Sequence, residues 1–277
     1  MSGSPIDKGR PSGLDRDTVM KRGKWVTSIL LVLGLLAAGA VLCLHLLTRD
    51  LPSESHIRDT ILERYPTRPN ATWVPLSQIS PALQQAVITW EDPTFYVHKG
   101  FSIPEIGRSI VRDIRARAYV RGASTITQQV AKNMYLSPEK SLKRKLREAV
   151  LASRIEAALS KREILELYLN IAHWGPEMAG VEVAALRYCD KHADQLTWSE
   201  AALLTGILQN PIHFAPDLRP GRARDQQRRV LEKLLRFGHI SEQEYQQGRD
   251  QSILMLSPGD EESGESGSAH PTAESPG

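Results

Sequence analysis

The chain of 277 residues is predicted to be all-α, with one membrane-spanning helix ahead of a helical domain. Three observations indicate this class. An uninterrupted apolar segment lies near the N-terminus. In the body of the chain, serine and threonine caps precede segments whose apolar residues return every three or four positions. No run of alternating apolar and polar residues predicts a sheet.

The apolar segment at residues 25–47 is long enough to cross a bilayer. At about 1.5 Å per residue it reaches roughly 34 Å, against a hydrocarbon layer of about 30 Å. Lys21, Arg22 and Lys24 precede it, whereas Arg49 is the one basic residue just after it. The positive-inside rule therefore predicts a single-pass plasma-membrane protein with a cytoplasmic N-terminus and an extracytoplasmic body.

A cleaved signal peptide is the alternative interpretation of this segment. Signal peptides have an apolar region of about 7–15 residues that ends in a cleavage site of small residues. This segment is longer, and the residues at 44–47 do not form such a site. We therefore expect an uncleaved anchor.

Composition predicts five regions. They are a basic cytoplasmic tail (1–24), the transmembrane anchor (25–47), a linker (48–72), the main domain (73–250) and a disordered acidic tail (251–277). The last region has too few apolar residues to offset its ordering entropy. The net charge of +3 does not predict nucleic-acid binding. Cys43 lies in the anchor and Cys189 in the body, so no disulfide framework is expected.

Helix starts are expected where Ser or Thr is followed three residues later by Glu, because these residues form a capping box. This pattern begins at Ser102, Ser160, Thr197 and Ser241. Ser80 and Ser137, each followed by proline, are expected to be plain caps.

The segment from Gly122 to Asn133 is unusually polar for a helix start. Its hydroxyls, amides and lysine wrap more than one face, and free backbone N–H groups at a helix start attract anions. Read alone, this segment would be a capped, solvated helix.

The segments on either side of it change this interpretation, because together they form four motifs in a fixed order. Residues 91–100 match the first motif, Glu-Asp-x-x-Phe-x-x-His-x-Gly, and the segment 122–133 is itself the second motif, matched throughout. The third, Arg-Lys-x-x-Glu, is matched at 144–148, and the fourth, ending in Glu-x-Tyr-Leu-Asn, at 161–170. In this order the four motifs resemble those of the peptidoglycan glycosyltransferases, glycosyltransferase family 51. The resemblance covers about residues 73–237; it departs at Lys99 and at residues 188–190, which leaves acceptor-side detail open.

The resemblance implies a lysozyme-like, two-lobed helical domain with a cleft between the lobes. It implies an enzyme that polymerises lipid II into β-1,4-linked glycan strands, with inversion and displacement of undecaprenyl diphosphate, for bacterial cell-wall synthesis. The implied partners are lipid II, the lipid-linked glycan chain and the bilayer; proteins of cell-wall synthesis or division are further candidates, and no nucleic acid is expected.

The resemblance assigns catalysis to two carboxylates. Glu91 matches the general base and Glu148 the second family carboxylate. Because the diphosphate is a good leaving group, a base and a cationic clamp suffice. The expected substrate-binding residues are Asp92, His98, Ser124, Thr125, Gln129, Lys132, Asn133, Arg144 and Lys145.

Within that set, Lys132 and Arg144 are expected on the diphosphate, and His98 is expected to orient the loop of Glu91. A divalent cation, Mg²⁺ or Mn²⁺, is expected to be ligated mostly by the substrate diphosphate, with Glu148 as the candidate protein ligand. No organic cofactor is expected.

Two rival functions are a lytic enzyme and a non-catalytic scaffold. A lytic enzyme needs an acid in an apolar pocket, and Glu148 in a basic segment is a poor acid. A scaffold is disfavoured because Glu91 and Glu148 are both present. Ser137 and Lys140 fit the Ser-x-x-Lys spacing of penicillin-binding enzymes, but no Lys-Thr-Gly follows, so a monofunctional chain is expected. The segment 101–120 is either a bilayer contact or an ordinary core helix.

Overall fold

The computed structural model describes residues 16–64, 73–102, 107, 124–137, 139, 141–175 and 178–251. It divides into two units, Met1–Leu51 and Pro52–Gly277. The residues directly after Ser102, where the predicted helix would begin, and nearly all of the segment 101–120 lie outside the described residues.

The first unit is the helix α1 (Arg16–Thr48). Its part Thr27–Thr48 is long and apolar enough to cross a membrane. Its leucine, isoleucine and valine side chains from Ile29 to Leu46 are exposed, as expected of a surface that faces lipid. This agrees with the single-pass anchor predicted at residues 25–47.

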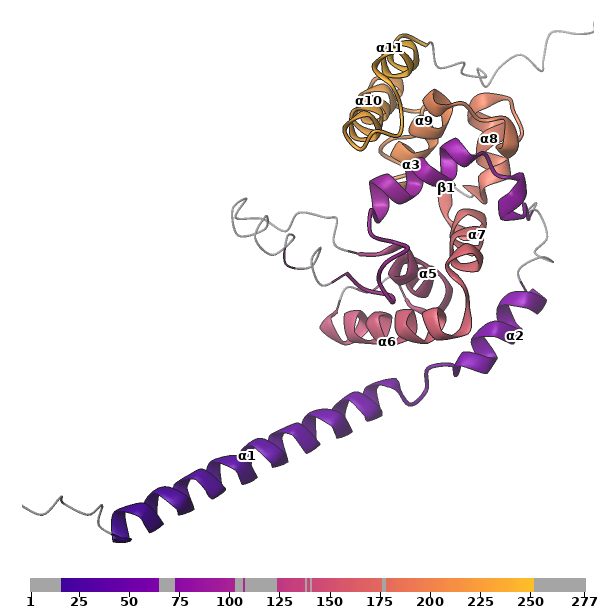
Figure 1. The fold of residues 1–277 in the computed structure, drawn as a ribbon. Coiled ribbons are helices and arrows are strands. Elements are labelled where there is room, and N and C mark those ends of the chain that lie inside the picture. The colour runs from indigo at the N-terminus through magenta and orange to yellow at the C-terminus, as the bar shows by residue number, and fades with distance from the viewer. Residues whose placement is uncertain are drawn as a thin grey trace, which may run out of the picture. The chain divides into compact units, whose positions relative to one another are not determined.

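The second unit is helical, as predicted (Figure 1). Its elements are α2 (Glu54–Arg64), η1 (Leu76–Gln78), α3 (Pro81–Glu91), α5 (Ile126–Tyr135), α6 (Leu142–Ala158), α7 (Lys161–Ile171), β1 (His173–Gly175), β2 (Met178–Ala179), α8 (Val181–Cys189), η2 (Ala193–Gln195), α9 (Trp198–Leu208), α10 (Pro220–Arg236) and α11 (Glu242–Asp250). The antiparallel pair β1–β2 was not predicted, because strands of two or three residues are too short to show alternation.

Most predicted caps are confirmed. Ser160, Thr197 and Ser241 form capping boxes at the starts of α7, α9 and α11. Ser80 caps α3, with Pro81 as its first residue.

The helix start predicted at Ser137 is wrong. The helix begins at Leu142, and Ser141 is its N-cap. The Ser141 hydroxyl accepts a hydrogen bond from the backbone N–H of Arg144 at 3.1 Å, which satisfies a donor of the first turn.

The helices form two groups on either side of α7 (Figure 1). One contains α2, α5 and α6, and the other contains α3, α9, α10 and α11. α9 is buried on almost every side between α3 and α10. Gly206 permits this packing, because a Cβ there would lie 2.9 Å from Cγ of Gln226 in α10. The predicted site residues come from the end of α3 and the loop after it, from α5 and the two residues before it, and from the first turns of α6.

Candidate active site

Glu91 is the last residue of α3. Its Oε2 accepts a hydrogen bond from Nε2 of Gln129 in α5 at 2.7 Å, so it joins the two groups of helices. Its Oε1 is buried and has no hydrogen-bond partner within the described part of the chain. The Tyr168 hydroxyl of α7 donates to Oε1 of Gln129 at 3.4 Å and so fixes the orientation of the amide. One carboxylate oxygen is held and the other is free to accept a proton.

The surroundings of Glu91 change its proton affinity. Burial is the largest effect and raises the pKa of Glu91 above its usual 4.5. The hydrogen bond from Gln129, then Lys233 and then Lys132, oppose that rise in pKa, whereas the neighbouring carboxylate of Asp92 adds to it. A raised pKa is what a general base needs, because a carboxylate of ordinary pKa is a weak base near neutral pH.

Burial also changes the pKa of Tyr168. Burial, and then the negative charge of Glu91, raise the pKa of Tyr168 well above its usual 10.0. Its hydroxyl therefore stays protonated and donates to Gln129.

Asp92 fastens the loop after α3 to the start of α5. The Asp92 side chain is buried; Nε2 of His98 lies 2.8 and 3.0 Å from its two oxygens. The backbone N–H of Ile126 donates to Oδ2 of Asp92 at 3.1 Å. The backbone N–H of Gly100 donates to Nδ1 of His98 at 3.2 Å, so Nε2 of that ring carries the proton and donates to Asp92.

Thr125, the N-cap of α5, completes this connection. Its hydroxyl donates to the carbonyl oxygen of Gly100 at 2.7 Å. Gly100 has a φ of +92°, and a Cβ there would lie 3.2 Å from the backbone of Ala152, so glycine suits this close approach. His98 therefore contacts Asp92, and the predicted substrate contacts of Asp92, His98 and Thr125 stay predictions.

A cationic cluster lies at the start of α6. Nη1 of Arg144 lies 3.1 Å from Oε2 of Glu148, and Nζ of Lys145 contacts Oε1 of Glu148. Nζ of Lys145 also donates to the Ser124 hydroxyl at 3.0 Å, which joins α6 to the residue before the Thr125 cap. Nε of Arg144 is buried without a hydrogen-bond partner among the described residues. The carboxylate of Glu148 thus pairs with two cations, and Nε of Arg144 can still donate a hydrogen bond to a bound anion.

Lys132 connects the two carboxylates electrostatically. Loss of solvation is the largest cause of its lowered pKa. Glu148 and Glu91 raise the pKa of Lys132, whereas Arg144 and Lys145 lower it further. Asn133, also predicted to bind substrate, is exposed beside Lys132. Lys140 lies outside the described residues.

A metal site of protein ligands alone is not found in the described ranges, where no group of three or more His, Cys, Asp or Glu side chains could hold an ion. Both oxygens of Glu148, the predicted candidate ligand, already contact cations. Glu148 therefore fits a metal poorly.

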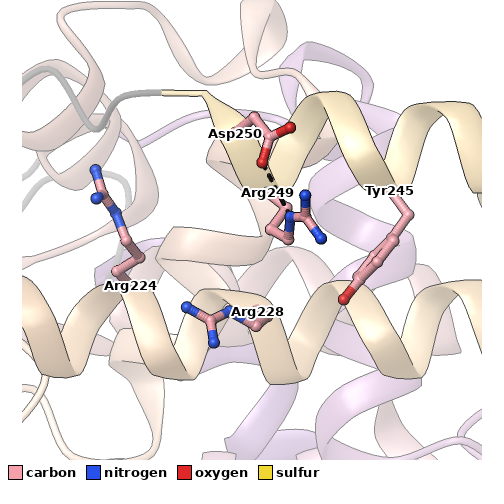
Figure 2. A pocket seen from close by; sticks show the side chains of 5 residues that line it. All are labelled: Arg224, Arg228, Tyr245, Arg249 and Asp250. Carbon is pink, nitrogen blue, oxygen red and sulfur yellow. Dashed lines mark hydrogen bonds and ion pairs between the residues drawn. The ribbon is translucent and has the colours of Figure 1, made fainter.

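A pocket lined by arginines lies apart from these residues. Figure 2 shows Arg224 and Arg228 on α10, with Tyr245, Arg249 and Asp250 on α11. Nε of Arg249 lies 2.9 Å from Oδ1 of Asp250. The pocket contains no predicted site residue, so we do not assign it to the reaction.

One residue near Glu91 was missed from the sequence. The positive charge of Lys233 in α10 lowers the pKa of Glu91, yet Lys233 belongs to none of the four motifs. A signal was present in the sequence. Lys233 stands between Val230 and Leu234, both buried, so it borders the apolar face of its helix.

The fold is helical, and its site combines a buried carboxylate with a cluster of cations, which suits general-base catalysis with an anionic leaving group. The model of the family described as Transglycosylase matches residues 58–235. The chain belongs to this family and is a peptidoglycan glycosyltransferase.

Two named relatives and one solved structure are similar to this chain. The chain is 43% identical over 169 residues to a biosynthetic peptidoglycan transglycosylase of Shigella boydii, covering 61% of this chain and 70% of that protein. It is 41% identical over 170 residues to penicillin-binding protein 2D of Bacillus subtilis, where the match covers 61% of this chain and only 25% of that protein. A crystal structure of penicillin-binding protein 1A from Haemophilus influenzae matches 47% of this chain and 16% of its own, at 26% identity and a TM-score of 0.32.

Proposed function

We propose that this peptidoglycan glycosyltransferase polymerises lipid II into β-1,4-linked glycan strands, with inversion and release of undecaprenyl diphosphate. One observation carries the proposal. Glu91 presents a free, buried carboxylate oxygen, while Gln129 holds the other oxygen at 2.7 Å.

The reaction needs one proton transfer. The 4-hydroxyl of the incoming lipid II gives its proton to Oε1 of Glu91, and its oxygen forms a bond to the anomeric carbon of the growing chain. The bond from that carbon to the diphosphate oxygen breaks, and the diphosphate leaves with the electron pair. Since attack and departure occur on opposite faces of the sugar, the α-linkage becomes β. The leaving diphosphate needs no acid, unlike the leaving group in glycoside hydrolysis.

The cations stabilise the departing charge in this proposal. Arg144 offers its unused Nε and a guanidinium whose planar geometry suits phosphate oxygens. Lys132 supplies a second cation. Lys145 holds Ser124 through a hydrogen bond and Glu148 through an ion pair. Asp92, His98 and Thr125 keep the loop after Glu91 against α5.

The membrane arrangement belongs to the proposal as well. The basic residues before the anchor favour a cytoplasmic N-terminus, with the catalytic domain outside, where lipid-linked sugars are polymerised. Mg²⁺ or Mn²⁺ would arrive with the substrate diphosphate rather than on a preformed protein site. Proteins of wall synthesis or division are candidate partners.

The test incubates the detergent-solubilised protein with lipid II and, in a separate reaction, with polymerised glycan. No other synthase is added. We expect lipid II to be consumed, with β-1,4-linked polymer and undecaprenyl diphosphate as products, and the glycan to remain intact. Cleavage of the glycan without consumption of lipid II would establish the lytic alternative and overturn the proposal.

A further inference from the structure

Lys233 lies against the end of α3 that carries Glu91. Its Nζ donates a hydrogen bond to the backbone carbonyl oxygen of Trp90 at 3.1 Å. The same ammonium lies 5.2 Å from the centroid of the Trp90 ring and 5.9 Å from that of the Phe237 ring. Cations are attracted to the faces of aromatic rings at such distances. Three contacts therefore hold this flexible side chain beside the residue that precedes Glu91.

These contacts depend on the tertiary fold. Lys233 is on α10, and Phe237 is the C-cap of the same helix, whereas Trp90 belongs to α3. α10 and α3 pack against each other within the second unit. The ring of His239 stacks on Phe237 at 6.2 Å, and Nε2 of His239 lies 3.2 Å from Nε2 of Gln85 in α3. The lysine is thus part of a packed junction and not a freely moving surface charge.

We propose that Lys233 is a positioning residue for the transfer reaction. It holds the Trp90–Glu91 end of α3 and supplies a positive charge that keeps the carboxylate of Glu91 anionic. This inference rests on the proposed function, because it concerns how Glu91 is prepared to accept the proton of lipid II.

The balance of charges around Glu91 supports this role. Burial and the neighbouring Asp92 favour the protonated acid, and protonated Glu91 cannot act as a base. Gln129, Lys233 and Lys132 oppose them, and Lys233 has a larger effect than Lys132. Lys132 is assigned to the diphosphate, whose negative charge offsets its own when the donor binds. Lys233 comes from another helix and so continues to favour the carboxylate at that stage.

The test compares pH–rate profiles of lipid II polymerisation. Lys233→Met removes the charge and keeps a long apolar side chain, whereas Lys233→Arg keeps the charge. Arg236→Met is the matched control, because it removes an exposed cation from the last turn of the same helix. Circular dichroism and thermal unfolding check that each variant is folded.

We expect Lys233→Met to move the acid limb of the profile toward higher pH, with the rate recovering as the pH is raised. Removing a cation raises the pKa of a nearby carboxyl group, so a more alkaline pH is needed to ionise it. Lys233→Arg and Arg236→Met should leave the limb in place. A folded Lys233→Met protein with the wild-type acid limb, while the wild type polymerises lipid II, would overturn this inference but leave the proposed function intact. Failure of the wild type itself would overturn the function.

A second variant keeps the test decisive if Lys233→Met does not fold. Phe237 is 50% exposed, so Phe237→Leu removes one ring beside the ammonium with little effect on the core. We expect a smaller shift of the acid limb in the same direction. An unchanged limb in this variant would equally contradict the role of Lys233.

Discussion

Replacing Glu91 with glutamine is expected to abolish polymerisation of lipid II and to leave the fold intact. Glutamine has nearly the same size, and its carbonyl oxygen can still accept the hydrogen bond that Gln129 gives to Oε2 of Glu91. It cannot accept a proton as a carboxylate does. General-base catalysis contributes about 10²–10⁴-fold to a rate, so we expect a loss of at least that order.

The measurement is the rate of polymer formation from lipid II, with thermal unfolding recorded for each protein. Glu232→Gln is the matched control, since Glu232 is an exposed glutamate of α10 outside the site. The control should retain the wild-type rate. Substantial polymer from a folded Glu91→Gln protein would rule out Glu91 as the base.

Replacing Arg144 with alanine is expected to weaken binding of the donor more than binding of the acceptor. The change removes Nη1, which lies 3.1 Å from Glu148, and the buried Nε that has no partner among the described residues. A hydrogen bond to a charged group contributes about 1.5–3 kcal/mol, so we expect roughly a tenfold to hundredfold loss of donor affinity. The leaving diphosphate would lose the same donors, so the maximal rate should fall too.

Donor and acceptor affinities are separated by varying a lipid-linked glycan oligomer at fixed lipid II, and then the reverse. Lys143→Ala is the control, because Lys143 is an exposed cation of the same helix. Equal losses at both sites, or the same loss in the control, would contradict the diphosphate clamp.

Local patterns in the sequence predicted most of the fold. A capping box needs only the cap and the residue three positions later, so Ser160, Thr197 and Ser241 were recognised without tertiary information. The prediction at Ser137 was wrong because two nearby serines are both plausible N-caps. The N-cap is Ser141, whose hydroxyl accepts a hydrogen bond from the backbone N–H of Arg144. The strands β1 and β2 depend on pairing with each other, which no short pattern encodes.

The candidate site was predicted in part. The resemblance to the family predicted that Glu91, Lys132 and Arg144 belong to one site, because each of these residues matches a family motif. It did not predict their contacts. Gln129 was expected to bind substrate, and its amide also holds Glu91 through a hydrogen bond that no motif predicted. Lys233 reaches Trp90 across 143 residues of sequence, a contact that exists only once α10 packs on α3.

The most direct test of the central claim is a titration of Glu91 beside the pH–rate profile. Carbon NMR of glutamate-labelled protein, with Glu91→Gln to assign the signal, gives the pKa of Glu91. We predict a pKa above 4.5, because burial outweighs the opposing cations and the Gln129 hydrogen bond. Since the base must be ionised, the polymerisation rate should rise with pH through that same pKa. A Glu91 pKa at or below 4.5, or a rate that does not follow its ionisation, would contradict the account.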